Sequence, residues 1–206
     1  MAYFSKAFLF SHLPKAGGGS LQSAFDAAGS DLDGKVISHH NTALEFLTSL
    51  KKYHFFLVRN PWDYYVSQYE YGRSQKEHGY VWEANNFSFD DFCKFLCSFP
   101  IEGFRDLDSV GYQSKYFFNF SYTFEEIERL DIENPPPSIV KVYRLEDGLE
   151  SVVGDLNSKF NLSLQLPSKR FNSSPRRPYR EYYSESTRQL IADTERVLIK
   201  RFNYSF

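Results

Sequence analysis

The chain has 206 residues and a formal net charge of −2, from 24 Lys and Arg against 26 Asp and Glu. This length fits one domain that buries its own core, and a hydrophobic fraction of 42% excludes a wholly disordered chain. The near-neutral balance excludes a broad nucleic-acid-binding face, which requires a strongly basic domain. A small anionic ligand remains compatible, because it needs only a few well-placed cations.

The sequence also bears on the cellular compartment. No apolar run approaches the ~20 residues of a membrane-spanning helix, and the first residues lack a signal-peptide pattern. Cys93 and Cys97 are the only cysteines and provide no disulfide framework. We therefore expect a cytoplasmic protein without a membrane span. Asn-x-Ser sequons such as the one at Asn86 would instead fit the lumenal part of a secreted enzyme.

Short apolar runs and capping residues predict alternating strands and helices. Strands are expected at 7–13, 36–38, 54–58 and 139–143, and helices at 20–28, 42–50, 145–160, from Pro61, after Ser88 and after Ser184. This alternation predicts a three-layer α/β/α domain with a central, mainly parallel sheet. Residues 1–206 are expected to form that single domain, with 121–138 as a surface excursion ending in a proline run.

A glycine-rich segment lies between the first predicted strand and the first predicted helix. It reads Pro14-Lys15-Ala16-Gly17-Gly18-Gly19-Ser20-Leu21. Glycines let backbone N–H groups approach an anion closely, and a helix N-terminus adds partial positive charge. Lys15 supplies a full charge and Ser20 a hydroxyl, so the segment predicts a phosphate cradle. It is not the nucleoside-triphosphate loop, because the lysine precedes the glycines. A solvent-facing lysine on an ordinary glycine-rich turn fits the same residues.

A second candidate site follows the predicted strand 54–58. Arg59 stands at the carboxyl edge of the sheet, where ligands bind in open α/β folds. Ser67 lies seven residues beyond Asn60, about two helical turns, and so shares a face with the helix start. Arg59 and Ser67 are therefore expected to hold one phosphate from two sides. The same residues also fit an arginine at the surface, paired with Asp63, and a helical serine without a role.

Together the two segments resemble the sulfotransferase family that uses 3′-phosphoadenosine 5′-phosphosulfate (PAPS). The first resembles P-K-(T/S)-G-(G/T)-T-S-L and the second resembles R-(D/N)-P-x-x-R-x-x-S-x-Y. Segments 113–116, 143–147 and 201–206 resemble late landmarks of the carbohydrate-type branch. Two departures from the pattern matter, because Gly19 replaces a threonine and Tyr64 replaces an arginine.

The resemblance implies a fold like that of P-loop nucleotide kinases, with PAPS as donor co-substrate and no metal. It implies transfer of the sulfuryl group to an acceptor hydroxyl, expected on a carbohydrate or a small molecule. Lys15 would stabilise the leaving oxygen, and Arg59 and Ser67 would hold the 3′-phosphate. The residues implied at the 5′-phosphate side are Lys15, Ala16, Gly17, Gly18, Gly19 and Ser20.

The catalytic base is expected among two adjacent histidines. His39 and His40 follow the predicted strand 36–38, and imidazole titrates near neutral pH. Side chains alternate along a strand, so one of the pair faces the site. His40 begins a segment that resembles the family's H-x-T-A pattern, which favours His40 over His39. A structural hydrogen bond is the competing role for either histidine.

A third basic segment spans residues 169–180 and holds five cations without an acid. The resemblance implies that its residues, Arg176 and Arg177 among them, contact the donor. A solvated basic loop is the other interpretation. Two further functions stay open: a nucleotide kinase on a related fold, and a nucleotide-binding relative that has lost catalysis.

Overall fold

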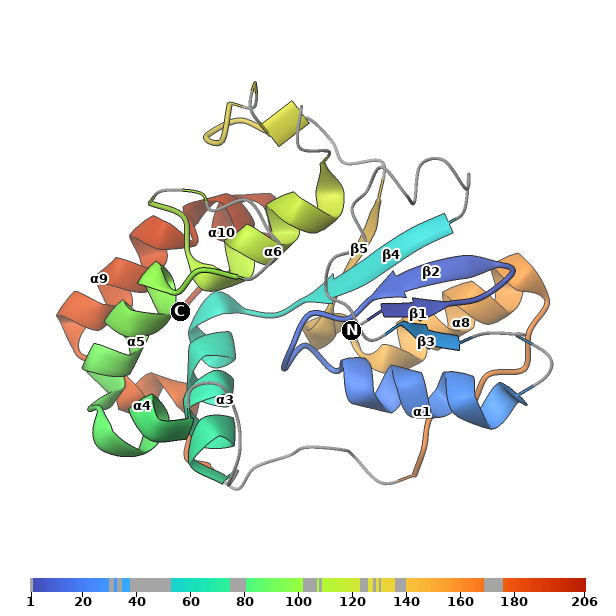
Figure 1. Cartoon of the computed structure of the whole chain (residues 1–206), viewed down its shortest axis with the longest axis horizontal. Helices are drawn as coiled ribbons and strands as arrows, with labels where there is room; N and C mark the ends of the chain where they lie inside the picture. The colour runs from blue at the N-terminus through green and yellow to red at the C-terminus, as the bar shows by residue number, and fades with distance from the viewer. Residues whose placement is uncertain are drawn as a thin grey trace.

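The computed structural model describes residues 2–29, 32, 35–37, 53–74, 81–101, 107, 109–122, 126–127, 129, 131–135, 140–168 and 176–206. Figure 1 shows the strands gathered on one side of the molecule and most of the helices on the other. The elements, in chain order, are β1 (Ala2–Phe4), β2 (Phe8–Ser11), α1 (Gly18–Ala28), β3 (Lys35–Ile37), β4 (Tyr53–Val58), α3 (Pro61–Ser74), α4 (Val81–Asn86), α5 (Phe89–Ser98), α6 (Tyr112–Ser121), β5 (Lys141–Arg144), η2 (Leu145–Asp147), α8 (Leu149–Phe160), η3 (Tyr179–Tyr182), α9 (Glu185–Thr194) and α10 (Arg196–Phe202).

The described strands form one five-stranded sheet in the order β3-β1-β2-β4-β5. β2 pairs with β4 and β4 pairs with β5 in parallel, whereas β1 is antiparallel to both β2 and β3. Four strands therefore share one direction, which confirms the predicted α/β class with a mainly parallel sheet. The antiparallel β1 was not predicted, because three residues are too few to display a strand period. A tight turn joins it to β2, in which Phe8 N–H donates to Ser5 Oγ at 3.0 Å.

One face of the sheet is covered by α1 and α8 through stacked aromatic rings. Phe8 lies 5.2 Å from Phe25 of α1 and 5.8 Å from Phe160 of α8, measured between ring centroids. Phe10 and Phe55 point to the same face and lie 5.1 Å apart. Adjacent strand residues alternate between faces, so this aromatic layer uses every second residue of β2 and β4.

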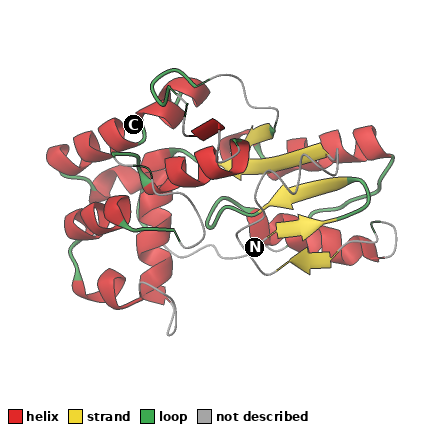
Figure 2. Ribbon diagram, turned by 45° about the horizontal axis from the view of Figure 1, so that its top comes forward, coloured by secondary structure: helices red, strands yellow, loops and turns green. Residues whose placement is uncertain are grey.

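The opposite face packs against α6. Phe56 of β4 lies 5.3 Å from Phe120 and 6.2 Å from Phe117, between ring centroids. Phe117 in turn contacts Phe202 of α10 at 6.1 Å. The sheet thus lies between two sets of helices, as Figure 2 shows for the row of strands flanked by helices. Many of the chain's aromatic side chains therefore lie in this core.

Most predicted boundaries shift by one to three residues, but two predicted helices are divided. The helix expected over 145–160 opens as the short turn η2, and Gly148, with φ +85°, separates it from α8. The terminal helix predicted after Ser184 has the predicted cap, since Ser184 Oγ accepts from Thr187 N–H, but it breaks at Glu195 into α9 and α10. The helix predicted at 42–50 lies outside the described residues.

The surface excursion predicted at 121–138 is wrong at its start. Ser121 is the last residue of α6, and Tyr122 and Ile127 are buried in the core. Burying the apolar side chains of Tyr122 and Ile127 is favourable, so this segment begins inside the domain and not at its surface. Among the described helices, none combines the length and the apolar character needed to cross a membrane.

Candidate functional site

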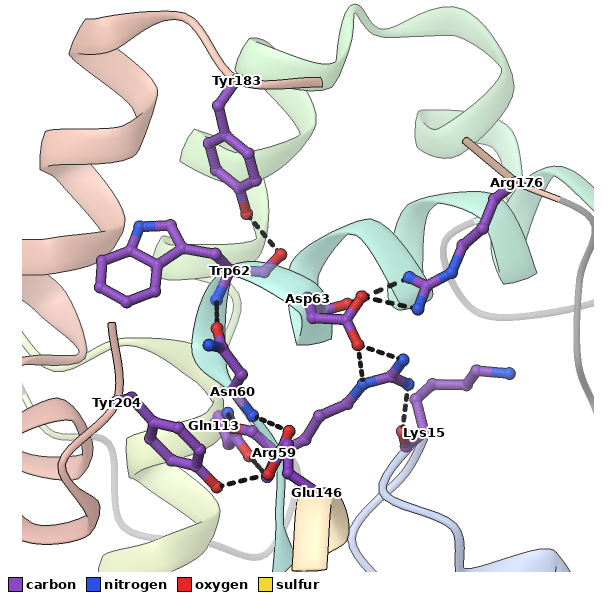
Figure 3. A network of polar contacts seen from close by, with 10 residues as sticks. All are labelled: Lys15, Arg59, Asn60, Trp62, Asp63, Gln113, Glu146, Arg176, Tyr183 and Tyr204. Carbon is purple, nitrogen blue, oxygen red and sulfur yellow. Dashed lines mark hydrogen bonds and ion pairs between the residues drawn. The ribbon is translucent and has the colours of Figure 1, made fainter. Parts of the chain in front are cut away.

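The candidate site lies where β2 and β4 end. These neighbouring strands are parallel, with Ser11 paired to Phe56, so their carboxyl ends meet at one edge of the sheet. β2 leads into the segment 12–17 before α1, and β4 leads into Arg59 and Asn60 before α3. Figure 3 shows the side chains that converge there. The topology therefore brings together the two segments singled out in the sequence.

The glycine-rich segment turns directly into α1, which begins at Gly18 and not at Ser20 as predicted. Gly17 is the N-cap with φ +83°, and a Cβ there would lie 2.7 Å from Leu145 Cδ1, so only glycine fits. α1 has no side-chain cap. Gly18, Gly19 and Ser20 thus form its first turn. Ser20 N–H already donates to Gly17 O at 3.2 Å, which removes one of the amides predicted to face a phosphate.

Gly18 makes room for a neighbouring ring. A Cβ at Gly18 would overlap the His12 imidazole, which packs against the glycine backbone. Ala16, two residues before Gly18, is buried in the core. His12 therefore supports the shape of the segment and occupies the space that a larger residue at position 18 would need.

Lys15 extends its ammonium group over the ring of Tyr71 in α3, 3.7 Å from the ring centroid. Its own backbone is left-handed, with φ +61°, an uncommon conformation for a residue with a Cβ. Among the described residues the ammonium donates no hydrogen bond. Burial, and after it the positive charges of Arg59 and Arg176, together lower the pKa of Lys15 from 10.5 to about 8. The ammonium is therefore oriented and has no hydrogen-bond acceptor within the described part of the chain, so it is available to an anion.

Arg59 is held by two segments at once. Its Nε and Nη2 donate to Asp63 Oδ2 at 2.7 and 2.5 Å, and its Nη1 donates to Lys15 O at 3.0 Å. The side chain is 13% exposed. These bonds use three of the five guanidinium N–H groups. The other two N–H groups have no partner among the residues that the structure describes, and they are available to a ligand.

Arg176 reaches the same carboxylate from a distant part of the chain. Its Nη2 donates to Asp63 Oδ1 at 2.6 Å and its Nη1 to Asp63 O at 3.3 Å. Asp63 thus lies between two guanidinium groups, as Figure 3 shows. Lys15, Arg59 and Arg176 gather around the Asp63 carboxylate, and the Glu146 carboxylate also acts on Arg59, so the formal charge of these five groups is +1. The arrangement is suited to a multiply charged anion.

Ser67 and Arg177, predicted for the same site, are placed differently. Ser67 is buried on α3, four residues beyond Asp63, and no hydrogen bond joins its hydroxyl to a described residue. Arg177 is exposed and lies over the Tyr182 ring, 4.4 Å from its centroid. Arg176 therefore belongs to the cation cluster, whereas Arg177 does not contact it.

The pairing of Arg59 with Asp63 was the competing interpretation of the second motif, and the structure contains it. The pair is not at the open surface, however, because it shares Asp63 with Arg176 and contacts the Lys15 segment. Tyr64, which stands where the family pattern has arginine, is wholly buried. Its hydroxyl accepts from Gln68 Nε2 at 2.7 Å, so this position adds no cation to the site.

Asn60 has the predicted capping role and further contacts besides. Its Oδ1 accepts from Trp62 N–H at 3.1 Å at the start of α3. Its N–H donates to Glu146 Oε1 at 2.6 Å, and its Nδ2 donates to Ser205 O at 2.9 Å. Tyr204 also donates to Glu146, from its hydroxyl to Oε2 at 3.1 Å. The last residues of the chain thus brace the turn that carries Arg59.

Sequence reasoning did not identify the bridging role of Asp63 or the contact of Tyr71 with Lys15. The i,i+4 spacing of Arg59 and Asp63 was a usable signal for the first ion pair. No local signal links Arg176 to position 63, since 113 residues separate them. The candidate bases His39 and His40 lie outside the described residues, as does most of the basic segment 169–180 before Arg176.

Comparison with known proteins adds no assignment: neither the protein-family models nor the curated proteins give a match. Within the described part of the chain, no three His, Cys, Asp or Glu side chains group as a metal site. The chemistry of the site is therefore argued from its own residues.

Proposed function

We propose that the chain is a PAPS-dependent sulfotransferase with the P-loop-like sulfotransferase fold, acting on a hydroxyl of a carbohydrate. The observation that carries the proposal is the convergence of Lys15, Arg59 and Arg176 beside the N-terminus of α1. PAPS carries two separate anionic groups, a 5′-phosphosulfate and a 3′-phosphate. The site offers two kinds of anion receptor at the ends of adjacent parallel strands.

On the 5′ side, α1 lacks a side-chain cap, and the N–H groups of its first turn attract an anion. Lys15 adds an ammonium that is held over the Tyr71 ring and is already partly desolvated. In the reaction, the bond between sulfur and the bridging oxygen of the 5′-phosphate breaks as the acceptor oxygen bonds to sulfur. The electron pair stays on the phosphate, and Lys15 would stabilise that developing charge.

On the 3′ side, two guanidinium N–H groups of Arg59 have no partner within the described part of the chain, and Arg176 approaches from the opposite flank of Asp63. The Ser67 hydroxyl lies on the same helix as Asp63. A phosphomonoester carries about −1.5 to −2 at neutral pH, which complements the surplus charge of the cluster. A 3′-phosphate is also what distinguishes PAPS from ATP.

The acceptor hydroxyl must lose its proton during transfer. His40, with His39 as the second candidate, is proposed as the base that accepts it. The proton then leaves on the imidazole, so no metal is required for this step. Replacing His40 with alanine is expected to lower turnover by about 10²-fold.

The first experiment is a thermal-shift comparison of adenosine 3′,5′-bisphosphate with AMP. At equal ligand concentration, the ligand that binds the folded state more tightly raises the melting temperature more, so the bisphosphate is expected to give the larger shift. Equal shifts would contradict the 3′-phosphate assignment. The second experiment offers radiolabelled PAPS with a panel of carbohydrate hydroxyl acceptors. Transfer supports the enzyme, and magnesium-dependent ATP turnover would favour a nucleotide kinase instead.

One observation favours a second candidate, a nucleotide-binding relative without transferase activity. Asp63 already occupies one side of Arg59, and Tyr64 and Gly19 depart from the family pattern. Bisphosphate binding without transfer to any acceptor in the panel would support this second function.

A further inference from the structure

The backbone of Arg59 is held by a side chain from another helix. Gln113, the second residue of α6, accepts from Arg59 N–H through Oε1 at 2.8 Å and donates from Nε2 to Arg59 O at 3.0 Å. Gln113 is wholly buried. A single amide thus satisfies both polar groups of residue 59, in the manner of a neighbouring strand (Figure 3).

This contact occurs where the sheet ends. β4 stops at Val58, whose partner on β5 is Arg144, so residue 59 has no further strand to pair with. Without Gln113, both backbone groups of Arg59 would need new partners at the base of the cation cluster. The two bonds instead fix the backbone from which the guanidinium extends toward Asp63 and Lys15 O.

The helix that carries Gln113 is itself anchored at its first turn. Glu195, wholly buried between α9 and α10, accepts from Gln113 N–H at 2.9 Å, Ser114 N–H at 2.9 Å and Ser114 Oγ at 2.6 Å. It also accepts from the Tyr65 hydroxyl of α3 at 2.9 Å. A carboxylate at a helix N-terminus satisfies amides that the helix leaves unpaired. Glu195 therefore joins α3 to α6 and leaves Gln113 little freedom.

We propose that Gln113 is a positioning residue of the anion site, which aims Arg59 at the 3′-phosphate by holding the Arg59 backbone. This inference rests on the proposed function and deepens it, because it assigns nucleotide discrimination to a residue that touches no ligand. Its effect is expected to be largest at the phosphate that Arg59 would contact. The 5′ side is built from Lys15 and the start of α1, and Arg59 reaches it only through the bond from Nη1 to Lys15 O, so a smaller effect is expected there.

The test compares Gln113→Met with a matched control. Methionine has a similar size and makes neither bond to Arg59. Asn157→Leu removes the same type of contact elsewhere, because Asn157 of α8 binds Leu164 O at 3.1 Å and Leu164 N–H at 2.8 Å. Dissociation constants for adenosine 3′,5′-bisphosphate and AMP are measured by calorimetry below each variant's melting temperature.

Gln113→Met is expected to weaken bisphosphate binding about tenfold and to leave AMP binding within about twofold. Asn157→Leu lowers the melting temperature but keeps the ratio of the two constants. Equal weakening of both ligands, or of neither, would overturn the positioning role. If the wild-type protein itself fails to discriminate the ligands, the proposed nucleotide is wrong.

A second readout separates these two failures without any ligand. The Arg59 Nε–H resonance reports its bond to Asp63, so Gln113→Met is expected to shift that resonance and speed its exchange with water. Asn157→Leu leaves it in place. An unmoved Arg59 resonance in Gln113→Met refutes positioning by Gln113, whichever nucleotide the site prefers.

Discussion

The ammonium nitrogen of Lys15 lies 3.7 Å from the centroid of the Tyr71 ring. A residue of the segment after β2 is thereby held by a residue of α3, across the site. A cation over an aromatic face gains about 0.5–2 kcal/mol. The contact keeps the ammonium extended in the absence of ligand.

Replacing Tyr71 with leucine is therefore expected to weaken bisphosphate binding by about three- to tenfold, since Lys15 loses its oriented position. Tyr71→Phe keeps the ring face and is expected to bind as the wild type does. Calorimetric titration of both variants measures the difference. If phenylalanine is as weak as leucine, the tyrosine hydroxyl and not the ring face is responsible.

Lys15→Met is expected to abolish most transfer, by about 10²-fold or more, because a neutral side chain cannot stabilise the leaving phosphate. Initial rates with radiolabelled PAPS measure this loss. The exposed Lys94 gives a control, since Lys94→Met removes a lysine that pairs with Asp91 on the same helix and lies outside the site. A normal rate for Lys15→Met would reject its catalytic role.

The same substitution also tests the electrostatics of the folded state. The pKa of Lys15 in the folded chain, about 8, lies below the ordinary lysine value of 10.5, so charged Lys15 destabilises the fold. That penalty is complete below pH 8 and declines between pH 8 and 10.5, where the unfolded chain keeps the proton longer. Lys15→Met is thus expected to unfold at higher denaturant concentration than wild type at pH 7. The difference in denaturant midpoint between Lys15→Met and the wild type should become smaller by pH 10.

Asp63→Asn separates the two effects of the bridging carboxylate. Removing the charge leaves the two guanidinium groups of Arg59 and Arg176 side by side without the counter-charge between them. The free energy of unfolding is expected to fall by about 1–3 kcal/mol, because solvent only partly reaches these groups. The bisphosphate then supplies the missing negative charge, so its stabilising shift should exceed that in the wild type. Thermal unfolding with and without ligand measures both. Asp91→Asn is the control, because Asp91 forms an exposed ion pair with Lys94. Its free energy of unfolding is expected to change by less than about 0.5 kcal/mol.

His54 makes the fold sensitive to acid. Its Nε2 lies 2.8 Å from Ser11 Oγ on the buried sheet, and burial lowers its pKa from 6.5 to about 3. Between these values the unfolded chain binds a proton that the folded chain does not, so stability falls as pH falls, by up to ~1.4 kcal/mol per pH unit. His54→Gln should remove this slope in urea titrations between pH 6.5 and 4. An unchanged slope would locate the acid sensitivity elsewhere.

The fold class could be predicted from local patterns of apolar residues, because the buried strands and helices of the core require them. Phe8 and Phe10 in one run and Phe55 and Phe56 in another predicted strands, because buried parallel strands read as continuous apolar runs. The helix start at Asn60 was predictable from capping chemistry alone. Gly148 and Glu195 divide helices that the apolar pattern shows as continuous, since periodicity does not register a single interruption.

The site was predictable only where its residues are close in sequence. Lys15 and Arg59 follow strands, and the ends of parallel strands meet at one edge. Asp63 was weighed only as a competing partner of Arg59, and its second bond, to Arg176, depends on how the whole chain folds back. The buried amide of Gln113 has the same origin, because 54 residues separate it from Arg59.

The contacts around Arg59 and Asn60 span much of the chain. They join residues 44, 54, 86 and 145 positions apart, through Lys15, Gln113, Glu146 and Ser205. Contacts between residues so far apart in the sequence are expected to form late in folding. Closing the long loops between them costs chain entropy before their hydrogen bonds form. During synthesis, the bond from Asn60 to Ser205 O cannot form until residue 205 has left the ribosome. A fragment that ends before residue 205 lacks this support for the turn that carries Arg59, and it is expected to bind the proposed nucleotide more weakly.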